Sequence, residues 1–435
     1  MTSREIAVLL EGVRAGTITE TNGRLRLRYD DRYRQLDATP LSVGMPIQVA
    51  EHGHEPVSAF LWGLLPDNDR VLQRWGQTFQ VSPSNAAALL STPIGADCAG
   101  AAQFATLEHA DALLERGGSI DWLDEGELAQ RLRDLSSDPA DWHGARRHTG
   151  QFSLAGAQAK TALRYDSERD RWGVPHGREP TTHILKPGVR GFDQLALNEH
   201  ICLATARRMG LLAARTTIWQ FEDQAVVGVE RFDRARLADG SLVRVHQEDL
   251  CQALAVHPTR KYQHDGGPGV ADIAALVRRL LPRREAIHAL ERFVDALLFN
   301  WLICGTDAHA KNYGLLLSGQ QIRLAPLYDV ASMLPYETDP LQLHLAMKVG
   351  GTYRLKDITA HAWHKLANEL DLDADHVLLR ARELGEQLPD ALAEICGDAD
   401  VVTTGGQMPA RFHDAVARWC QRKLKGLGRY PPNDA

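Results

Sequence analysis

Apolar and polar side chains alternate in the first part of the chain as they do in β-strands. In segment 24–29 three arginines alternate with leucine and tyrosine, directly after the turn-forming pair Asn22–Gly23. This pattern predicts a hairpin with one buried face. The apolar run 6–10 predicts another strand, so we expect a β-rich N-terminal region.

Helical signals follow this strand-rich region. The apolar segment 60–65 ends at a proline, and Ser82-Pro83-Ser84 favours the start of a short helix that runs to Leu90. Asp124 and Glu127 have the spacing of a capping box, followed by leucines at helical intervals. The polar stretch 136–150 breaks this pattern, and we expect a domain boundary within it.

Strands return after residue 150. Segments 162–165 and 183–185 have the pattern of strands, and the charged segment 166–178 between them is typical of a hairpin tip. A helix is predicted over 194–209, before Gly210, and a hairpin over 216–229.

The rest of the chain is expected to be mainly helical from residue 247 onward. Segment 286–303 forms the longest apolar helical pattern, and segment 314–317 is predicted to be a strand. The chain is thus expected to contain strands with one helix, followed by a mainly helical half. Two-lobed kinases have this order of elements, although the order of elements does not by itself identify a function.

Composition narrows the class of protein. The 435 residues carry 49 Lys+Arg against 56 Asp+Glu, a net charge of −7, which excludes a globally basic nucleic-acid binder. No apolar run approaches the ~20 residues that cross a bilayer, and the N-terminus lacks the features of a signal peptide. Six scattered cysteines are typical of reduced thiols packed in cores. We therefore expect a cytoplasmic protein of two or three domains with no membrane contact.

The segment Gly305–Tyr313 carries the strongest chemical signal. Asp307 can accept a proton from a hydroxyl group, and Asn312 can offer an amide oxygen to a metal ion. Asp329, which follows a predicted hairpin, would complete a magnesium site. An aspartate, an asparagine five positions later and a further aspartate match the pattern of phosphoryl-transfer enzymes. The structural alternative is a helix cap and a turn residue.

Other segments could contact a nucleotide. Lys186 ends an apolar strand from which it can reach phosphates, although a lysine at a strand end is more often a solvated edge residue. Glu199, on the following helix, could be its ion-pair partner or an ordinary solvated residue. The small-residue loop 153–161 could bind phosphates through its N–H groups, although it lacks the Walker A spacing and suits a plain turn as well. Segment 229–234 could offer backbone groups to an adenine edge or be an ordinary charged strand end.

Two further features favour structural roles. The pair His361 and His364 has metal-compatible spacing but no evident third ligand, so a helix surface or core is the better interpretation. The basic stretch 411–429 could contact DNA phosphates, but an amphipathic helix that packs its apolar face explains it better.

Taken together, these segments resemble the HipA family of serine/threonine kinases, the toxins of HipA–HipB toxin–antitoxin modules. The resemblance covers about residues 5–355. Its motifs are FLWGLLPDNDR (60–70), SLAGAQAKTAL (153–163), HILKP (183–187), NEHICLATARRMGL (198–211), VERFDR (229–234), HQEDLCQAL (246–254), FNWLICGTDAHAKNYGLLL (299–317), LYDVAS (327–332) and AMKVGG (346–351).

The resemblance implies an α+β fold: a two-lobed, protein-kinase-like structure behind a small β-rich N-terminal domain. The expected division is an N-terminal domain over 1–145, a kinase N-lobe over 146–235 and a helical C-lobe over 236–435.

The resemblance also implies the site. Asp307 would be the catalytic base, Asn312 and Asp329 would hold Mg²⁺, and Ser153 would be the autophosphorylated residue whose modification switches the kinase off. Protein kinases place a lysine two residues after the catalytic aspartate, whereas this chain has His309 there and Lys311 two positions later. His309 would contact the transferred group or brace the loop. The expected ATP-binding residues are Ser153, Ala155, Gly156, Ala157, Gln158, Lys186, Glu230, Arg231, Phe232, His309, Lys311, Asn312, Tyr328 and Asp329.

The implied partners are a HipB-like helix-turn-helix antitoxin, operator DNA contacted through that antitoxin, and a protein substrate of the aminoacyl-tRNA synthetase class. Two alternatives remain open from the residues: a small-molecule kinase on the same scaffold, and a non-catalytic corepressor that holds an antitoxin on DNA.

Overall fold

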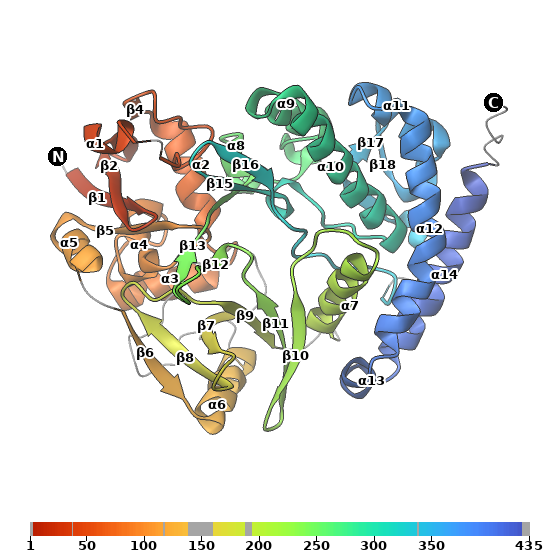
Figure 1. The fold of residues 1–435 in the computed structure, drawn as a ribbon, viewed down its shortest axis with the longest axis horizontal. Coiled ribbons are helices and arrows are strands. Elements are labelled where there is room, and N and C mark those ends of the chain that lie inside the picture. The colour runs from red at the N-terminus through yellow and green to blue at the C-terminus, as the bar shows by residue number, and fades with distance from the viewer. Residues whose placement is uncertain are drawn as a thin grey trace. The chain divides into compact units, whose positions relative to one another are not determined.

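The computed structural model describes residues 3–36, 38–115, 118–137, 160–187, 194–336 and 339–428. Contacts divide the chain into two compact units, each assembled from segments far apart in the sequence (Figure 1). The first unit comprises Met1–Asp193, Trp219–Thr259 and Gly314–Ala325, and the second comprises Gln194–Ile218, Arg260–Tyr313 and Pro326–Ala435.

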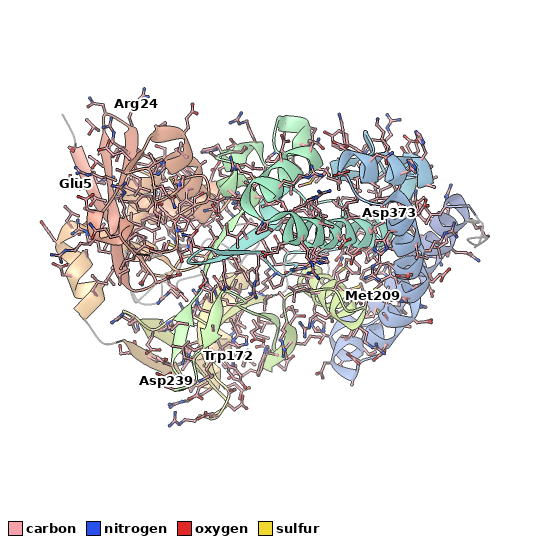
Figure 2. The ribbon with its side chains drawn as sticks, turned by 45° about the horizontal axis from the view of Figure 1, so that its top comes forward. Glu5, Arg24, Trp172, Met209, Asp239 and Asp373 are labelled. Carbon is pink, nitrogen blue, oxygen red and sulfur yellow. The ribbon has the colours of Figure 1, made fainter. Side chains whose placement is uncertain are left out.

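A five-stranded antiparallel sheet opens the first unit, in the order β4-β3-β2-β1-β5. The predicted hairpin is confirmed: β2 and β3 join through Asn22 and Gly23, both with positive φ. The arginines of β3 are exposed, as Arg24 shows in Figure 2, while its leucines and tyrosine are buried. The strands are β1 (Ser3–Leu10), β2 (Val13–Thr21), β3 (Arg24–Tyr29), β4 (Glu51–His52) and β5 (Ala102–Thr106).

Short helices accompany this sheet. They are α1 (Asp31–Arg34), α2 (His54–Leu64), α3 (Asp69–Phe79), α4 (Ala86–Leu90) and α5 (Leu107–Glu115). The helix predicted to start at Ser82 begins later, because the side chain of Asn85 accepts the N–H of Ala88 (2.8 Å) and caps α4.

A six-stranded sheet in the order β10-β11-β9-β7-β8-β6 follows. The prediction that 166–178 is a hairpin tip is wrong, because Trp172 and Val174 are buried and their segment pairs with strands on both sides. Only the turn at 167–170 forms the tip. The strands are β6 (Ser119–Leu123), β7 (Thr161–Asp166), β8 (Arg171–His176), β9 (His183–Pro187), β10 (Thr216–Phe221) and β11 (Gln224–Glu230).

Helix α6 (Glu125–Ser137) belongs to the same unit. The predicted capping box is confirmed, since Asp124 and Glu127 exchange hydrogen bonds between side chain and backbone N–H (2.8 and 3.1 Å). The leucines at 128, 132 and 135 are buried, as their helical spacing indicates. The boundary predicted within 136–150 falls mostly outside the described residues.

Smaller elements complete the first unit. They are β12 (Arg234–Arg236) paired with β13 (Leu242–Arg244), the sheet β14 (His246–Asp249), β15 (Gly314–Ser318) and β16 (Gln321–Leu324), and helix α8 (Leu250–Ala253). The prediction of a mainly helical chain from residue 247 onward therefore missed part of a sheet.

The second unit is mainly helical. Its helices are α7 (Leu195–Arg208), α9 (Val270–Leu280), α10 (Arg283–Ile303), α11 (Ala360–Glu369), α12 (Ala374–Cys396), α13 (Ala399–Gly405) and α14 (Met408–Gly426), with one hairpin of β17 (His344–Val349) and β18 (Thr352–Arg354). Short 3₁₀ helices occur in both units: η1 (Pro93–Ala96) in the first, η2 (Pro258–Arg260) at the boundary, and η3 (Gln263–Asp265), η4 (Ala310–Asn312), η5 (Pro340–Gln342) and η6 (Leu355–Asp357) in the second. The predicted apolar helix is α10, whose C-terminal half is almost wholly buried.

The prediction that the cysteines pack in cores is confirmed. All six cysteines are buried and free of disulfides. Within the described part of the chain, no helix is both long and apolar enough to span a bilayer.

Candidate active site

The candidate catalytic loop begins where α10 ends, in the second unit. Cys304 adopts a left-handed conformation (φ 54°), and the N–H of Gly305 donates to the carbonyl oxygen of Asn300 (2.7 Å). A Cβ atom at position 305 would lie 2.2 Å from Asn300 Oδ1. A side chain at position 305 would therefore displace that of Asn300, so glycine fits this close approach at the start of the loop.

Hydrogen bonds close the loop between Asp307 and Asn312. The carbonyl oxygen of Asp307 accepts the N–H of His309 and the side-chain Nδ2 of Asn312, each at 2.8 Å. The N–H of Asn312 donates to the carbonyl oxygen of His309 (2.9 Å). The carboxylate of Asp307 is 67% exposed, whereas Asn312 is buried. The loop thus presents one carboxylate to solvent above a fixed amide.

His309 braces this loop from inside. Its ring is buried, Nε2 lies 4.0 Å from Asp307 Oδ1, and Nδ1 has no hydrogen-bond partner among the described residues. Burial lowers the pKa of His309, with Lys261 and Lys311 acting in the same direction and Asp307 opposing them. The imidazole is therefore neutral at physiological pH.

Tyr262 is a site residue that the sequence did not indicate. Its hydroxyl group donates to Asp307 Oδ1, and its ring packs edge-on against His309 with centroids 4.8 Å apart. The neighbouring Lys261 accepts the N–H of Ala310 through its carbonyl oxygen (3.4 Å). Tyr262 lies 45 positions before Asp307, so no local pattern links the two.

Asp329 lies in a separate segment of the same unit. It has a left-handed backbone (φ 55°), which non-glycine residues adopt mainly in turns and functional sites. The hydroxyl group of the adjacent Tyr328 donates to the carbonyl oxygen of Lys311 (2.6 Å), which ties this segment to the catalytic loop. The charge of Asp329 also acts on His309. The structure therefore brings Asp307, Asn312 and Asp329 together.

A clamp from α7 holds the chain just after Asp329. Asn198 Nδ2 donates to the carbonyl oxygen of Ser332 (2.7 Å), and the N–H of Ser332 donates back to Asn198 Oδ1 (2.9 Å). Both residues are buried. The side chain of Asn198 thus takes the place of a backbone hydrogen-bond partner for Ser332. It fixes the path of the chain after the turn at Asp329.

These residues fit a magnesium ion and a phosphate group. Because Nδ2 of Asn312 is used by the Asp307 carbonyl, its Oδ1 is oriented as an oxygen ligand, the kind that Mg²⁺ prefers. Asp329 offers a second oxygen donor. The orphaned Nδ1 of His309 and the two lysines that influence its pKa are suited to phosphate oxygens.

Lys186 lies in the first unit. It is on β9, opposite Val227 of β11, with β7 on the other side of the strand. Its side chain is 5% exposed. Pairing with β11 fixes the backbone of this lysine. That its side chain reaches phosphates stays a prediction. Glu199, its candidate partner, is buried on α7 in the second unit.

The predicted adenine-contacting segment follows β11 in the first unit. Glu230 is exposed, Phe232 is half-buried and Arg231 is buried. The guanidinium of Arg231 donates to both carboxylate oxygens of Asp233, through Nε (3.0 Å) and Nη2 (2.7 Å). It also donates to the hydroxyl group of Thr181 (2.8 Å). The side chain of Arg231 is thus directed into the protein.

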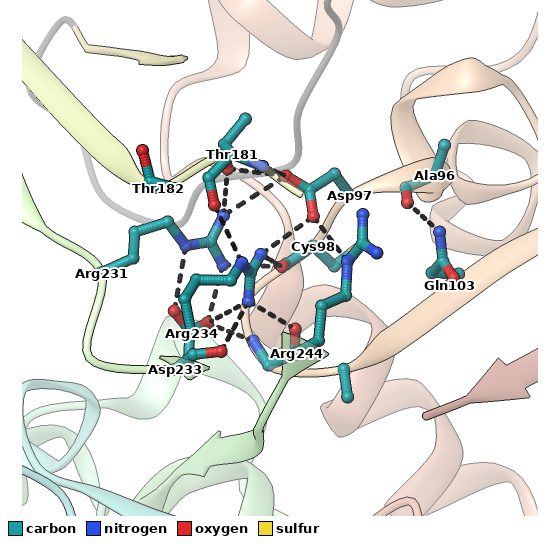
Figure 3. Close-up of polar contacts among 12 residues, drawn as sticks. Ala96, Asp97, Cys98, Gln103, Thr181, Thr182, Arg231, Asp233, Arg234 and Arg244 are labelled. Carbon is teal, nitrogen blue, oxygen red and sulfur yellow. Dashed lines mark hydrogen bonds and ion pairs between the residues drawn. The ribbon is translucent and has the colours of Figure 1, made fainter. Parts of the chain in front are cut away.

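Arg231 belongs to a buried ionic cluster that Figure 3 shows. Asp97 lies at its centre and accepts from Arg234 Nη2 (2.9 Å) and Arg244 Nε (3.0 Å). Burial alone would raise the pKa of Asp97, but Arg234, Arg244 and Arg231 together hold it well below its usual range. This cluster fixes the backbone on both sides of Phe232.

Some predicted positions fall outside the described residues. They are Ser153, Ala155, Gly156, Ala157 and Gln158 of the small-residue loop.

The interpretations of the His361 pair and the basic C-terminal stretch as structural features are consistent with the fold. Both histidines are exposed on α11, and the described residues hold no group of three or more His, Cys, Asp or Glu side chains placed as metal ligands. Helix α14 buries Phe412, Val416 and Trp419, as its pattern predicts.

Comparisons with known proteins agree with this picture. Residues 6–105 match the HipA N-terminal domain, and residues 152–392 match the HipA-like C-terminal domain. A putative kinase of Sinorhizobium fredii, Y4mE, is 33% identical over 426 residues, covering 96% of this chain and 98% of the relative. The chain therefore belongs to the HipA family.

Two further matches extend the comparison. The serine/threonine-protein kinase toxin HipA of Shewanella oneidensis is 29% identical over 371 residues, covering 83% of this chain and 82% of the relative. A chain in the solved complex of the Shewanella oneidensis toxin–antitoxin proteins HipA and HipB with operator DNA superimposes with a TM-score of 0.80. It is 25% identical, and the match covers 97% of both chains. The predicted α+β, HipA-type fold is thereby confirmed.

Proposed function

We propose that this protein is an ATP- and Mg²⁺-dependent serine/threonine protein kinase that acts as the toxin of a toxin–antitoxin module. The arrangement of Asp307, Asn312 and Asp329 around one loop in one compact unit carries this proposal. Family membership supports it, since relatives in the family bear the names of kinases.

Asp307 acts as the base that accepts the proton of the substrate hydroxyl group. Its carboxylate is exposed to an incoming substrate, and the hydrogen bond from Tyr262 sets its orientation. His309 stays neutral and keeps the loop in place, because burial disfavours its charged form. Its Nδ1, which has no hydrogen-bond partner among the described residues, would also donate to a phosphate oxygen.

Asn312 and Asp329 are the residues that would hold Mg²⁺ against the phosphates of ATP. When bound, the ion supplies positive charge that stabilises the transferred phosphoryl group. Lys186 would contact phosphates from β9. The main chain of Glu230–Phe232 would contact adenine, because the Arg231 guanidinium is engaged in the buried cluster. Lys311 and Tyr328 complete the nucleotide site, together with the small-residue loop Ser153–Gln158.

The wider role rests on the relatives. We propose a HipB-like helix-turn-helix antitoxin as partner, with operator DNA contacted through it, because a HipA in that assembly matches this chain over 97% of its length. The proposed substrate is an aminoacyl-tRNA synthetase, and Ser153 is the proposed autophosphorylation site that silences the kinase. The division into 1–145, 146–235 and 236–435 and the cytoplasmic location stay predictions.

Phosphate transfer from Mg-ATP tests the assignment. Asp307→Asn and Asp329→Ala should each lower the rate of autophosphorylation by about 100-fold or more, the range for loss of a general base or a charge-stabilising group. Intact-mass spectrometry with peptide mapping should place the phosphate on Ser153 in the wild type. The exposed carboxylate Asp121, 65% exposed and far from this loop in sequence, provides the control Asp121→Asn, which should leave the rate unchanged.

Other outcomes separate the alternatives. Near wild-type phosphorylation in both variants would contradict the assigned roles. Phosphate found on a small molecule and never on a protein would favour the small-molecule kinase. A protein that does not bind ATP at all would favour the corepressor. Transfer of phosphate to purified aminoacyl-tRNA synthetases would identify the substrate.

A further inference from the structure

A pocket of about 640 Å³ lies in the second unit, between helix α14 and the residues Leu334, Pro335, Tyr336 and Pro340. Its volume is in the range of pockets that bind small molecules or peptide side chains. No residue assigned above to phosphate transfer lines it. The pocket is therefore a separate feature of the molecule.

The lining of this pocket carries an excess of positive charge. Three exposed arginines of α14, Arg411, Arg418 and Arg422, stand against one carboxylate, Asp414, which leaves +2. Asp414 has His413 within ion-pair distance (3.4 Å). Among the described residues, none of the three guanidinium groups has a hydrogen bond or ion pair with a carboxylate. A row of exposed arginines along one helix, none of them paired with a described carboxylate, favours an anionic ligand.

The spacing of the arginines indicates a long ligand with several negative charges. On an α-helix, positions 411 and 418 are about 10 Å apart along the axis and positions 411 and 422 about 16 Å. An extended peptide covers that distance with about five residues. One inorganic anion cannot reach all three guanidinium groups.

The remaining lining favours a peptide over a DNA duplex. Leu334, Pro335 and Tyr336 form one wall, and Trp419 contributes from α14. The indole N–H of Trp419 donates to the carbonyl oxygen of Trp301 (3.1 Å), and only a small part of this residue, 3% exposed, lines the pocket. A concave site with apolar walls suits side chains with apolar stems, whereas duplex phosphates need an open, polar surface.

The position of the pocket connects it with the proposed chemistry. Leu334 follows Asp329 by five positions in the sequence, and both belong to the unit that contains the catalytic loop. We propose that this pocket docks an acidic segment of the protein that accepts the phosphate, and this inference rests on the proposed kinase function. Recognition then depends on carboxylates near the acceptor hydroxyl group.

Fluorescence anisotropy with the full-length chain tests the proposal. The probe is a labelled glutamate hexapeptide, with a glutamine hexapeptide as the uncharged counterpart. The triple variant Arg411→Gln, Arg418→Gln, Arg422→Gln should bind the glutamate peptide about tenfold more weakly than the wild type, because each exposed ion pair contributes about twofold or more. Lys425→Gln removes one charge from the same helix outside the pocket and should change affinity less than about twofold.

Peptide binding needs no phosphate transfer, so the two proposals can fail separately. Absent transfer from ATP in the wild type would count against the kinase, while the peptide titrations would still decide whether the pocket binds acidic segments. Equal affinity of wild type and triple variant for the glutamate peptide would overturn the pocket. The proposal would also be overturned if the glutamate peptide does not bind, while a short DNA duplex or pyrophosphate binds in a way that depends on the three arginines. If the triple variant melts at a lower temperature than the wild type, the single variant Arg418→Gln provides the same comparison of affinity for the glutamate peptide.

Discussion

Glu248 places a carboxyl group in the interior of the first unit. Its side chain is 1% exposed; Oε1 accepts the N–H of Val43 (2.8 Å), and Oε2 has no hydrogen-bond partner among the described residues. Burial raises the pKa of Glu248 to about 8, against the opposing hydrogen bonds from Ser42 and Val43. The group is therefore mainly protonated in the folded protein at neutral pH.

This shift makes stability depend on pH. The folded pKa of Glu248 lies above its ordinary value of 4.5, so its stabilising contribution is complete below 4.5 and is lost as the pH rises toward 8. Between these values its contribution to the free energy of unfolding should fall by up to about 1.4 kcal/mol per pH unit. Glu248→Gln should remove this dependence and be more stable than the wild type at the alkaline end. Urea denaturation of both proteins across that window measures it, and parallel pH profiles would contradict it.

At the residue scale, the candidate site residues could be identified from the sequence more readily than the contacts that these residues make. Asp307, Asn312 and Asp329 were recognisable because their spacing reflects one chemistry, and the structure brings them together. Tyr262 was not recognisable, because its hydrogen bond to Asp307 depends on the path of the intervening 45 positions. The burial of Arg231 was likewise hidden, since its partners Asp97 and Thr181 are distant in sequence.

At the scale of elements, local chemistry decided what could be predicted. The hairpin at Asn22–Gly23 and the capping box before α6 follow from short-range rules, and both are present. Strand β8 was missed because charged residues surround the short apolar pattern of Trp172 and Val174. Its place depends on pairing with β6 and β7, which a local pattern does not contain.

The clamp between α7 and the segment after Asp329 yields an element-scale prediction. Asn198→Ala would leave the buried N–H and carbonyl groups of Ser332 without partners, so the free energy of unfolding should fall by about 2–4 kcal/mol. Chemical denaturation measures this. Asn368→Ala is the matched control: its side chain is exposed on α11 and makes a hydrogen bond with the exposed His364 (3.1 Å), so the loss should stay below about 0.5 kcal/mol. An equal loss of unfolding free energy in the two variants would show that the hydrogen bonds between Asn198 and Ser332 do not stabilise the fold more than an exposed contact does.

At the scale of the whole molecule, the buried cluster joins two parts of the family architecture. Asp97 belongs to the segment that matches the HipA N-terminal domain, whereas Arg231, Asp233, Arg234 and Arg244 belong to the HipA-like C-terminal domain. Further buried hydrogen bonds within the first unit link the same two domains. They run from Gly100 N–H to Asp233 (2.7 Å), from His246 to the carbonyl oxygen of Leu41 (2.9 Å) and from Gln252 Nε2 to that of Phe60 (2.9 Å). The N-terminal domain therefore supports the backbone on which the proposed adenine contact depends.

Charge balance in this cluster gives the last prediction. Three arginines face two aspartates, so Asp97→Asn leaves one carboxylate for three buried cations and should cost about 3–5 kcal/mol of unfolding free energy. Adding Arg244→Gln removes one cation, returns the cluster to its original net charge and should recover part of that loss. Arg208→Gln breaks an ion pair with both partners more than half exposed and should cost less than about 1 kcal/mol. Urea denaturation of the full-length variants measures all three effects.

Recovery in the double variant, accompanied by a return of the KM for ATP toward the wild-type value, would connect the N-terminal domain with the nucleotide site, because a loss of packing alone would not respond to charge. A double variant less stable than Asp97→Asn would show that Arg244 is held by the backbone carbonyl groups of Arg178 and Glu179 rather than by Asp97.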